Sequence, residues 1–159
     1  MPLLRAALSW NFVLATAICA SLLAQLIKVL LNLFIFHRFI AERMWGAGGM
    51  PSSHSATVCA MVVATGRYCG VNSPIFAIAA VLSIIVMYDA MGVRYETGRE
   101  ARALNLLDRE RRERETTAAD REPLLEKPLE EKMGHTLPEI IAGVLVGLIA
   151  GIIVCQLLP

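Results

Sequence analysis

The sequence lacks an excess of charge of either sign. Its 159 residues contain 15 lysines and arginines against 14 aspartates and glutamates, which gives a formal net charge of +1. Proteins that bind nucleic acid through the phosphate backbone carry a basic surface. We therefore expect no nucleic-acid partner.

The sequence also lacks the cysteine patterns of zinc sites and disulfide frameworks. The four cysteines show no CxxC spacing and no cluster with histidine, and three of them lie inside apolar runs: Cys19, Cys59, Cys69 and Cys155. Isolated cysteines in apolar surroundings behave as small hydrophobic residues. We expect small buried thiols, no disulfide and no metal site.

Apolar residues, by contrast, are abundant. They make up 56% of the chain and occur in long blocks rather than in alternation. This pattern predicts a single all-α domain over residues 1–159, an integral membrane helical bundle of about four transmembrane helices. The expected spans are residues 10–36, 54–70, 75–93 and 138–158. The first is too long for a signal peptide and has no evident cleavage region. The second is short and only moderately apolar, so we expect it to lie partly inside the bundle.

A charged segment, residues 94–132, separates the third and fourth runs. It contains ten Lys/Arg and eleven Asp/Glu. Residues 97–115 read as a charged helix at the membrane surface, and residues 116–132 as a flexible linker. Basic residues mark the cytoplasmic side of membrane proteins. We therefore expect a multi-pass protein whose 94–132 segment is cytoplasmic and whose two termini are not.

Polar residues gather at the predicted cytoplasmic ends of all four runs. Ser52, Ser53 and His54 begin the second run, while His135 precedes the fourth and Glu139 lies at its start. Ionisable groups at membrane depth usually face the bundle interior or a watery cavity. The other residues at this level are Lys28, Asp89 and Arg94.

These residues predict a phosphate site. The second and fourth helices both begin at this end, and helix N-termini bind anions through free N–H groups and a partial positive charge. Gly49 and its glycine neighbours allow backbone amides to approach an anion closely. Each residue alone also has a structural explanation. Ser52 and Ser53 are good N-caps, and Thr136 with Glu139 forms a T-x-x-E capping box.

Four motifs in this order carry a family resemblance: GGMPSSHSA (48–56), IVMYDAMGVR (85–94), GREARALN (98–105) and GHTLPEIIAG (134–143). The sequence resembles the divergent branch of the type 2 phosphatidic acid phosphatase superfamily, described as acid phosphatase/vanadium-dependent haloperoxidase-related. The resemblance extends from about Lys28 to Gly151. It implies a lipid-phosphate phosphatase that works at the cytoplasmic membrane surface without metal or cofactor.

The resemblance also implies residue roles. His135 would be the nucleophile and form a phosphohistidine, Glu139 would orient it, and His54 would act as general acid and base. Substrate phosphate would be bound by Lys28, Ser52, Ser53 and Arg94. Gly49 and Asp89 complete the candidate substrate-binding set, although the phosphatase mechanism gives Asp89 no role. For Asp89 we expect an ion pair with Lys28 or Arg94 across the bundle.

Several positions depart from the superfamily pattern. Ser53 stands where glycine is usual, and Glu139 stands in place of aspartate. Ile35 stands seven residues after Lys28, where the superfamily has Arg-Pro, and Leu129 stands six residues before His135, where it has arginine. An alternative is therefore a non-catalytic membrane protein that binds phospholipid or organises partners through the charged segment. A third is a small transporter or channel, suggested by Lys28 and Asp89 inside apolar runs.

The fourth run contains glycines at four-residue spacing, which places them on one helix face: Gly143, Gly147 and Gly151. Such a face lets another helix approach closely. It predicts either a homo-oligomer or packing within the chain.

Overall fold

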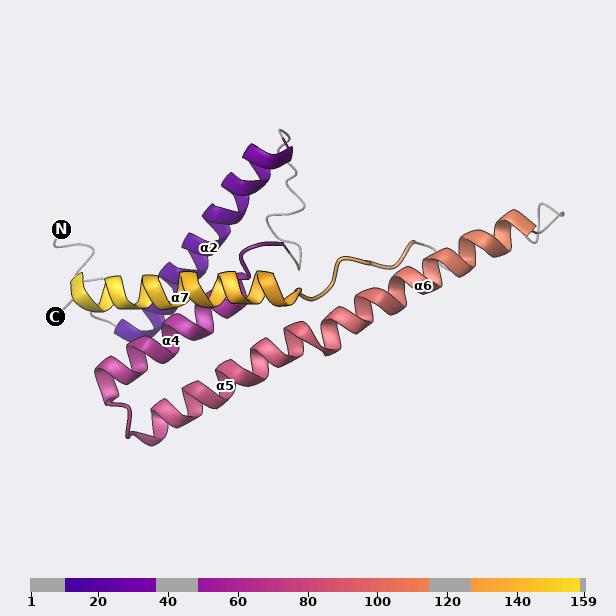
Figure 1. The fold of residues 1–159 in the computed structure, drawn as a ribbon. Coiled ribbons are helices and arrows are strands. Elements are labelled where there is room, and N and C mark those ends of the chain that lie inside the picture. Colours follow the sequence, from indigo (N-terminus) through magenta and orange to yellow (C-terminus); the bar gives the residue numbers. More distant parts are fainter. Residues whose placement is uncertain (1–10, 37–48, 115–126, 158–159) are drawn as a thin grey trace.

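The computed structural model describes residues 11–36, 49–114 and 127–157. These residues form five helices and no strands, which confirms the all-α prediction. The helices are α2 (Phe12–Phe36), α4 (Ser53–Cys69), α5 (Pro74–Met91), α6 (Val93–Arg114) and α7 (Leu137–Leu157) (Figure 1). The bounds of α2, α4, α5 and α7 differ from the predicted spans by at most two residues, whereas α6 begins four residues before the predicted charged helix.

Helix α4 forms the centre of the bundle, in contact with α2, α5 and α7. Its buried residues are small: Ser53, Ser55, Ala56, Val58, Cys59, Ala60, Ala64 and Thr65. Small side chains let helices approach closely, and in a membrane close packing is a main source of helix association. The second apolar run therefore lies inside the bundle, as its modest hydropathy predicted.

Three described helical stretches are long and apolar enough to span a membrane: residues 12–34, 74–114 and 137–157. Helix α4 is not among them, because its 17 residues extend about 25 Å, less than the hydrocarbon core of about 30 Å. The protein is an integral membrane helical bundle in which α4 lies sheltered among longer helices. Cys59 is the one buried cysteine, whereas Cys19 and Cys69 are exposed from the bundle, contrary to prediction.

The glycine face of α7 packs against α4 of the same chain. A Cβ at Gly143 would overlap the Ser52 carbonyl oxygen, and a Cβ at Gly147 would overlap the Ala56 carbonyl oxygen. At Gly151 the neighbour is the Val63 side chain. This face is therefore an intramolecular interface, and any association between copies of the chain would have to use another surface.

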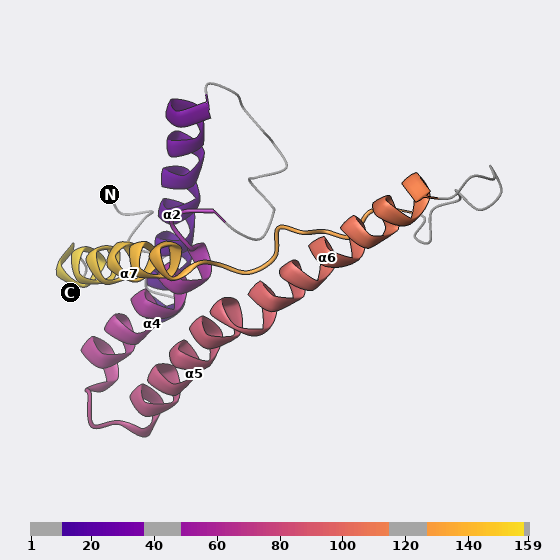
Figure 2. The ribbon, with the colours of Figure 1, turned by 45° about the vertical axis from the view of Figure 1, so that its right-hand side comes forward.

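Helix α6 continues α5 and extends beyond the bundle (Figures 1 and 2). Gly92 alone separates the two helices, and its N–H still donates to the Tyr88 carbonyl oxygen at 2.8 Å, as in a continuous helix. The prediction of a charged helix is confirmed, but its placement flat on the membrane surface is wrong, because α6 follows the direction of a spanning helix. Of the predicted linker, residues 116–126 lie outside the described residues, and residues 127–132 run back along α6 (Figures 1 and 2).

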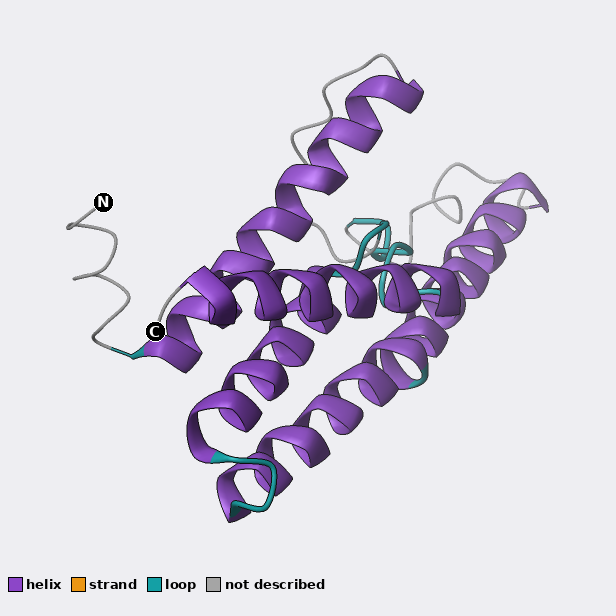
Figure 3. Cartoon of the chain, turned by 60° about the vertical axis from the view of Figure 1, so that its left-hand side comes forward, coloured by secondary structure: helices purple, strands orange, loops and turns teal. Residues whose placement is uncertain are grey.

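The start of α2, the turn between α4 and α5, and the end of α7 lie at one end of the bundle (Figure 3). The polar residues singled out above lie toward the other end. The number of passes stays a prediction, because three of the described helical stretches are long and apolar enough to span a membrane. Which end faces the cytoplasm stays a prediction.

Candidate active site at the polar end of the bundle

The beginning of α4 supplies a serine cap. Ser52 is fully buried, and its Oγ accepts hydrogen bonds from the Ser55 N–H at 3.3 Å and the Ser55 hydroxyl at 3.1 Å. The predicted capping role of Ser52 is thus confirmed. Ser53 is the first residue of the helix and is buried. The N–H groups of a first helical turn have no partner within the helix, so this terminus keeps donors for an anion.

The beginning of α7 orients a histidine. Glu139 Oε2 accepts the Thr136 N–H at 3.0 Å, which is the predicted capping-box bond, and lies 3.2 Å from His135 Nδ1. Pro138, in the first turn, does not prevent Glu139 from reaching back to both groups. A carboxylate can only accept, so this hydrogen bond places the imidazole proton on Nδ1 and leaves the Nε2 lone pair free.

The two helix beginnings are joined directly. The Ser52 N–H donates to the Glu139 carbonyl oxygen at 3.0 Å. Close contact is possible here because residue 143, one turn further along α7, is a glycine packed against Ser52. Both helices run away from this end, so the positive ends of two helix dipoles lie side by side. The sequence predicted both helix ends but not the bond between them.

His54 and His135 face each other across this junction. Their ring centroids are 6.3 Å apart and their planes are inclined by 60°. His135 is only 4% exposed, whereas His54 is exposed. One histidine is therefore held inside the protein and the other opens to the surroundings, with a separation that lets one phosphate contact both.

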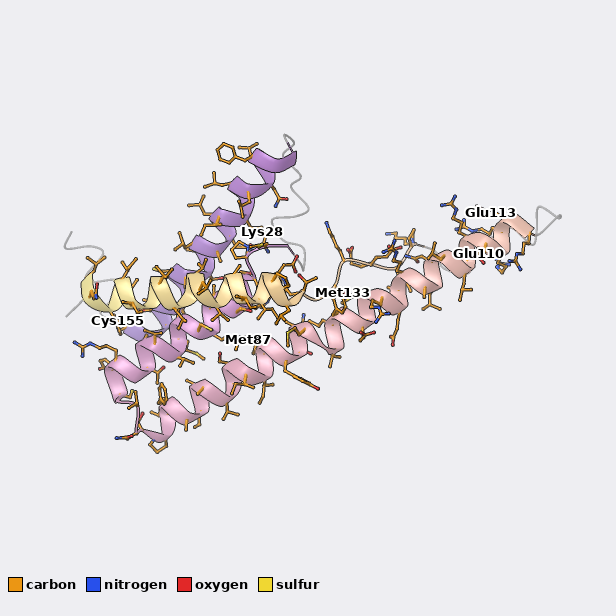
Figure 4. The ribbon with its side chains drawn as sticks, in the orientation of Figure 1. Lys28, Met87, Glu110, Glu113, Met133 and Cys155 are labelled. Atoms are coloured by element: carbon orange, nitrogen blue, oxygen red, sulfur yellow. The ribbon has the colours of Figure 1, made fainter. Side chains whose placement is uncertain are left out.

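Lys28 adds a buried cation from α2. Its side chain is 3% exposed and lies against Gly49, where a Cβ would be 3.6 Å from Lys28 Cδ. Gly49 has a φ of +86°, which favours glycine. Lys28 interacts electrostatically with Glu139 and both histidines. Figure 4 shows its side chain leaving α2 toward the beginning of α7.

Asp89 and Arg94 form an ion pair at the α5–α6 junction. Arg94 Nε lies 2.6 Å from Asp89 Oδ2, and the two side chains are 41% (Asp89) and 55% (Arg94) exposed. The predicted partner, Arg94, is confirmed. Its predicted position across the bundle is wrong, because α6 continues α5 and brings Arg94 within about one turn of Asp89. Arg94 also acts electrostatically on His54.

The protonation state of His135 follows from its surroundings. Burial lowers its pKa from the ordinary 6.5, the hydrogen bond and charge of Glu139 raise it, and the charges of Lys28 and His54 lower it; the net direction is downward. The neutral imidazole is therefore favoured near neutral pH. A neutral ring with its proton on Nδ1 is the form that a nucleophile requires.

Two contacts that hold His135 in place were not predicted from the sequence. The His135 N–H donates to the Ala90 carbonyl oxygen at 2.9 Å. Gly134 has a φ of +76° and lies against Tyr95, so closely that a Cβ would overlap the Tyr95 backbone. The glycine before His135 could be seen in the sequence, but its contact with the Tyr95 backbone could not be predicted. Among the described residues, no group of three His, Cys, Asp or Glu side chains could hold a metal ion.

Comparison with known proteins identifies the family of the chain. The sequence profile of the Divergent PAP2 family matches residues 9–150. The chain belongs to the Divergent PAP2 family. It is 34% identical over 145 residues to the "Uncharacterized membrane protein YuiD" of Bacillus subtilis (strain 168), a match that covers 87% of this chain and 90% of the relative. No solved structure matches the chain. The protein is thus a PAP2-like integral membrane protein.

Proposed function

We propose that this Divergent PAP2 family protein is a phosphohydrolase that removes phosphate from a membrane lipid phosphate. The observation that carries the proposal is the 3.2 Å contact between Glu139 Oε2 and His135 Nδ1, with the His54 ring facing His135. It gives one histidine the orientation of a nucleophile and leaves the other for proton transfer.

The reaction takes two steps. His135 Nε2 attacks phosphorus, the bond from phosphorus to the leaving oxygen breaks, and the protonated form of His54 gives that oxygen its proton. Burial and the charges of Arg94 and Lys28 lower the pKa of His54, which makes this protonated form a stronger acid. Glu139 stabilises the imidazolium character that develops on His135. In the second step water attacks the phosphohistidine, His54 takes a proton from this water, and the bond between phosphorus and Nε2 breaks. Inorganic phosphate and free His135 result.

Charge on the transferring phosphoryl group is stabilised by groups from several elements. Lys28 lies on α2, Arg94 begins α6, and Ser52 and Ser53 begin α4. Preorganised donors and cations aimed at developing charge lower the barrier most where water is partly excluded. Arg94, held by Asp89, supplies the guanidinium that the superfamily pattern places at residue 129.

The substrate class follows from the depth of the site. His135 directly precedes α7, Lys28 is buried about two turns before the end of α2, and His54 is exposed at the beginning of α4. A phosphate carried by a lipid headgroup reaches this level while its chains remain in the bilayer. By the distribution of basic residues, this is the cytoplasmic surface.

The second candidate is a phospholipid-binding or scaffold protein that keeps the anion site without turnover. Leu129, at the position of the superfamily arginine, favours it. The backbone of Leu129 is hydrogen-bonded to Asn105 of α6. Position 129 is therefore held on α6 and supplies no side chain that binds phosphate. The transporter alternative is not favoured, because Asp89 is paired with Arg94 at a helix end.

The test is phosphate release by purified protein in liposomes that contain phosphatidic acid or an isoprenyl phosphate. His135→Ala and His54→Ala are expected to abolish release, and Asn72→Ala, in the turn at the opposite end, is expected to leave it unchanged. A rapid base quench should trap a phosphoryl group on residue 135, and subsequent treatment with acid should remove it. Release that persists in folded His135→Ala would refute the mechanism. Lipid-phosphate binding without release would support the scaffold.

A further inference from the structure

The chain reaches His135 along α6. Residues 127–134, the return segment, run antiparallel to this helix without regular structure of their own (Figures 1 and 2). They end at His135, which lies in the candidate site. The path of the return segment therefore decides where the proposed nucleophile is placed.

Asn105 ties the return segment to α6. Its Nδ2 donates to the Leu129 carbonyl oxygen at 2.9 Å and to Glu131 Oε1 at 2.9 Å. Its Oδ1 accepts the Leu129 N–H at 3.0 Å. The side-chain amide thus pairs with both backbone groups of one residue, as a neighbouring strand would. Aspartate cannot replace it, because aspartate has no donor when ionised.

Further along, Gly98 lets the return segment touch the helix. A Cβ at this position would lie 2.8 Å from the Glu131 carbonyl oxygen and 3.1 Å from the Met133 carbonyl oxygen. The buried residues of this largely exposed helix are Gly98, Ala101 and Asp108. The glycine at position 98 of a charged helix is thus explained by the close approach of a second backbone.

The contact with α5–α6 continues to the catalytic end. Gly134 lies against the backbone of Tyr95, and the His135 N–H is bonded to the Ala90 carbonyl oxygen. Asn105, Gly98 and Ala90 therefore lie along one side of the long helix and meet successive parts of the return segment. Each contact fixes the position of the next residue toward His135.

We propose that Asn105 and Gly98 are positioning residues for His135, acting through the return segment. They are the last and first residues of the GREARALN motif, for which the phosphatase reaction itself supplies no role. The chemical consequence rests on the proposed function, because it concerns the residue that would attack phosphorus. The placement of His135 can be measured without turnover.

The experiment measures reaction of each histidine with diethyl pyrocarbonate in the purified full-length protein, followed by peptide mass spectrometry. In the wild type, buried His135 is expected to react slowly and exposed His54 quickly. Asn105→Ala removes three hydrogen bonds and is expected to raise the His135 rate about tenfold, by increasing the fraction of open molecules. The His54 rate should stay unchanged, which excludes general unfolding.

Leu106→Ala is the matched control, since Leu106 is the next residue on α6 and is exposed. Gly98→Ala is a second, independent variant, expected to raise the His135 rate by crowding the return segment. A His135 rate in both variants equal to that of Leu106→Ala would overturn the proposal. So would a parallel rise at His54.

Phosphate release separates this proposal from the proposed function. In an active protein, Asn105→Ala is expected to lower kcat with KM unchanged, because Lys28 and Ser52 lie on other elements. A wild type without turnover in which Asn105→Ala still exposes His135 would refute the phosphohydrolase and retain the positioning. An active wild type in which His135 reacts equally slowly in every variant would retain the phosphohydrolase and refute the positioning.

Discussion

Gly143 lets α7 pack closely against α4, and this close packing also places Glu139 beside Ser52 in the candidate site. Replacing Gly143 with alanine therefore tests both the stability of the bundle and the geometry of the site. The residue lies one turn beyond Glu139 on α7 and packs against Ser52, the cap of α4. An added Cβ would overlap the Ser52 carbonyl oxygen, and it would lie 2.9 Å from Ser55 Cβ and 3.1 Å from Ser52 Cβ. None of these atoms can rotate away.

Two opposing terms set the expected change in unfolding free energy. Alanine in a helix interior is favoured over glycine by about 1 kcal/mol. Overpacking a close contact costs about 1–3 kcal/mol, and fixed backbone atoms place this site toward the upper end. We therefore expect Gly143→Ala to destabilise the protein by about 1–2 kcal/mol.

Gly151→Ala is the matched control on the same glycine face. Its Cβ would lie 3.0 Å from Val63 Cβ, 3.1 Å from Val63 Cγ1 and 3.3 Å from Ala60 Cα, and none of these atoms would be as close as the Ser52 carbonyl oxygen is to a Cβ at Gly143. Milder crowding and the gain in helix propensity nearly cancel, so we expect little net change. Gly151 is also two turns further from Glu139 and should leave phosphate release unaltered.

The assay is reversible unfolding by SDS titration in mixed micelles, together with phosphate release. Gly143→Ala pushes α7 away from α4 and strains the bond between the Ser52 N–H and the Glu139 carbonyl oxygen. A displacement of about 1 Å of catalytic groups can cost up to about 100-fold in rate. Equal stability and equal release in the two variants would refute the argument that α4–α7 contact sets the site.

Burial lowers the pKa of His135 below its ordinary 6.5 while Glu139 raises it, so the acid limb of kcat/KM is expected below pH 6.5. Glu139→Gln should move that limb further down and reduce kcat; a limb above 6.5 would contradict this. Arg94→Ala should lower kcat/KM more than Asp89→Asn does, and neither should shift the SDS midpoint, because this exposed pair adds little stability; a clear loss of stability would assign the pair a structural role. In a chain whose other three cysteines are replaced by alanine, a membrane-impermeant maleimide added to intact cells should label Cys69. Protection of Cys69 until the cells are opened would reverse the predicted orientation.

Much of the fold was predictable, because an apolar run long enough to cross a membrane must satisfy its own backbone hydrogen bonds and therefore forms a helix. The four predicted apolar runs form helices α2, α4, α5 and α7 to within one or two residues, and three of these helices are long and apolar enough to span a membrane. The moderate hydropathy of residues 54–70 correctly indicated a helix inside the bundle. The direction of α6 was not predictable, since a charged helix after a glycine can either bend along the membrane or continue the preceding helix.

Within the site, the sequence by itself determined what is local. The Ser52 cap and the Thr136–Glu139 capping box depend on neighbouring residues, and helix geometry then brings Glu139 back to His135. The Asp89–Arg94 pair is local for the same reason, although it was expected across the bundle. Hydropathy and capping chemistry act over a few residues, so they can be read from the chain.

Only the tertiary structure decided which of these local units meet. The bond from Ser52 to Glu139, the facing rings of His54 and His135, and the backbone contact between His135 and Ala90 join segments far apart in the chain. Each depends on how closely two helices approach. The distance between two helices is set jointly by the small residues along their whole interface. The two helices of an interface come from separate segments of the chain, so no single stretch of sequence contains both.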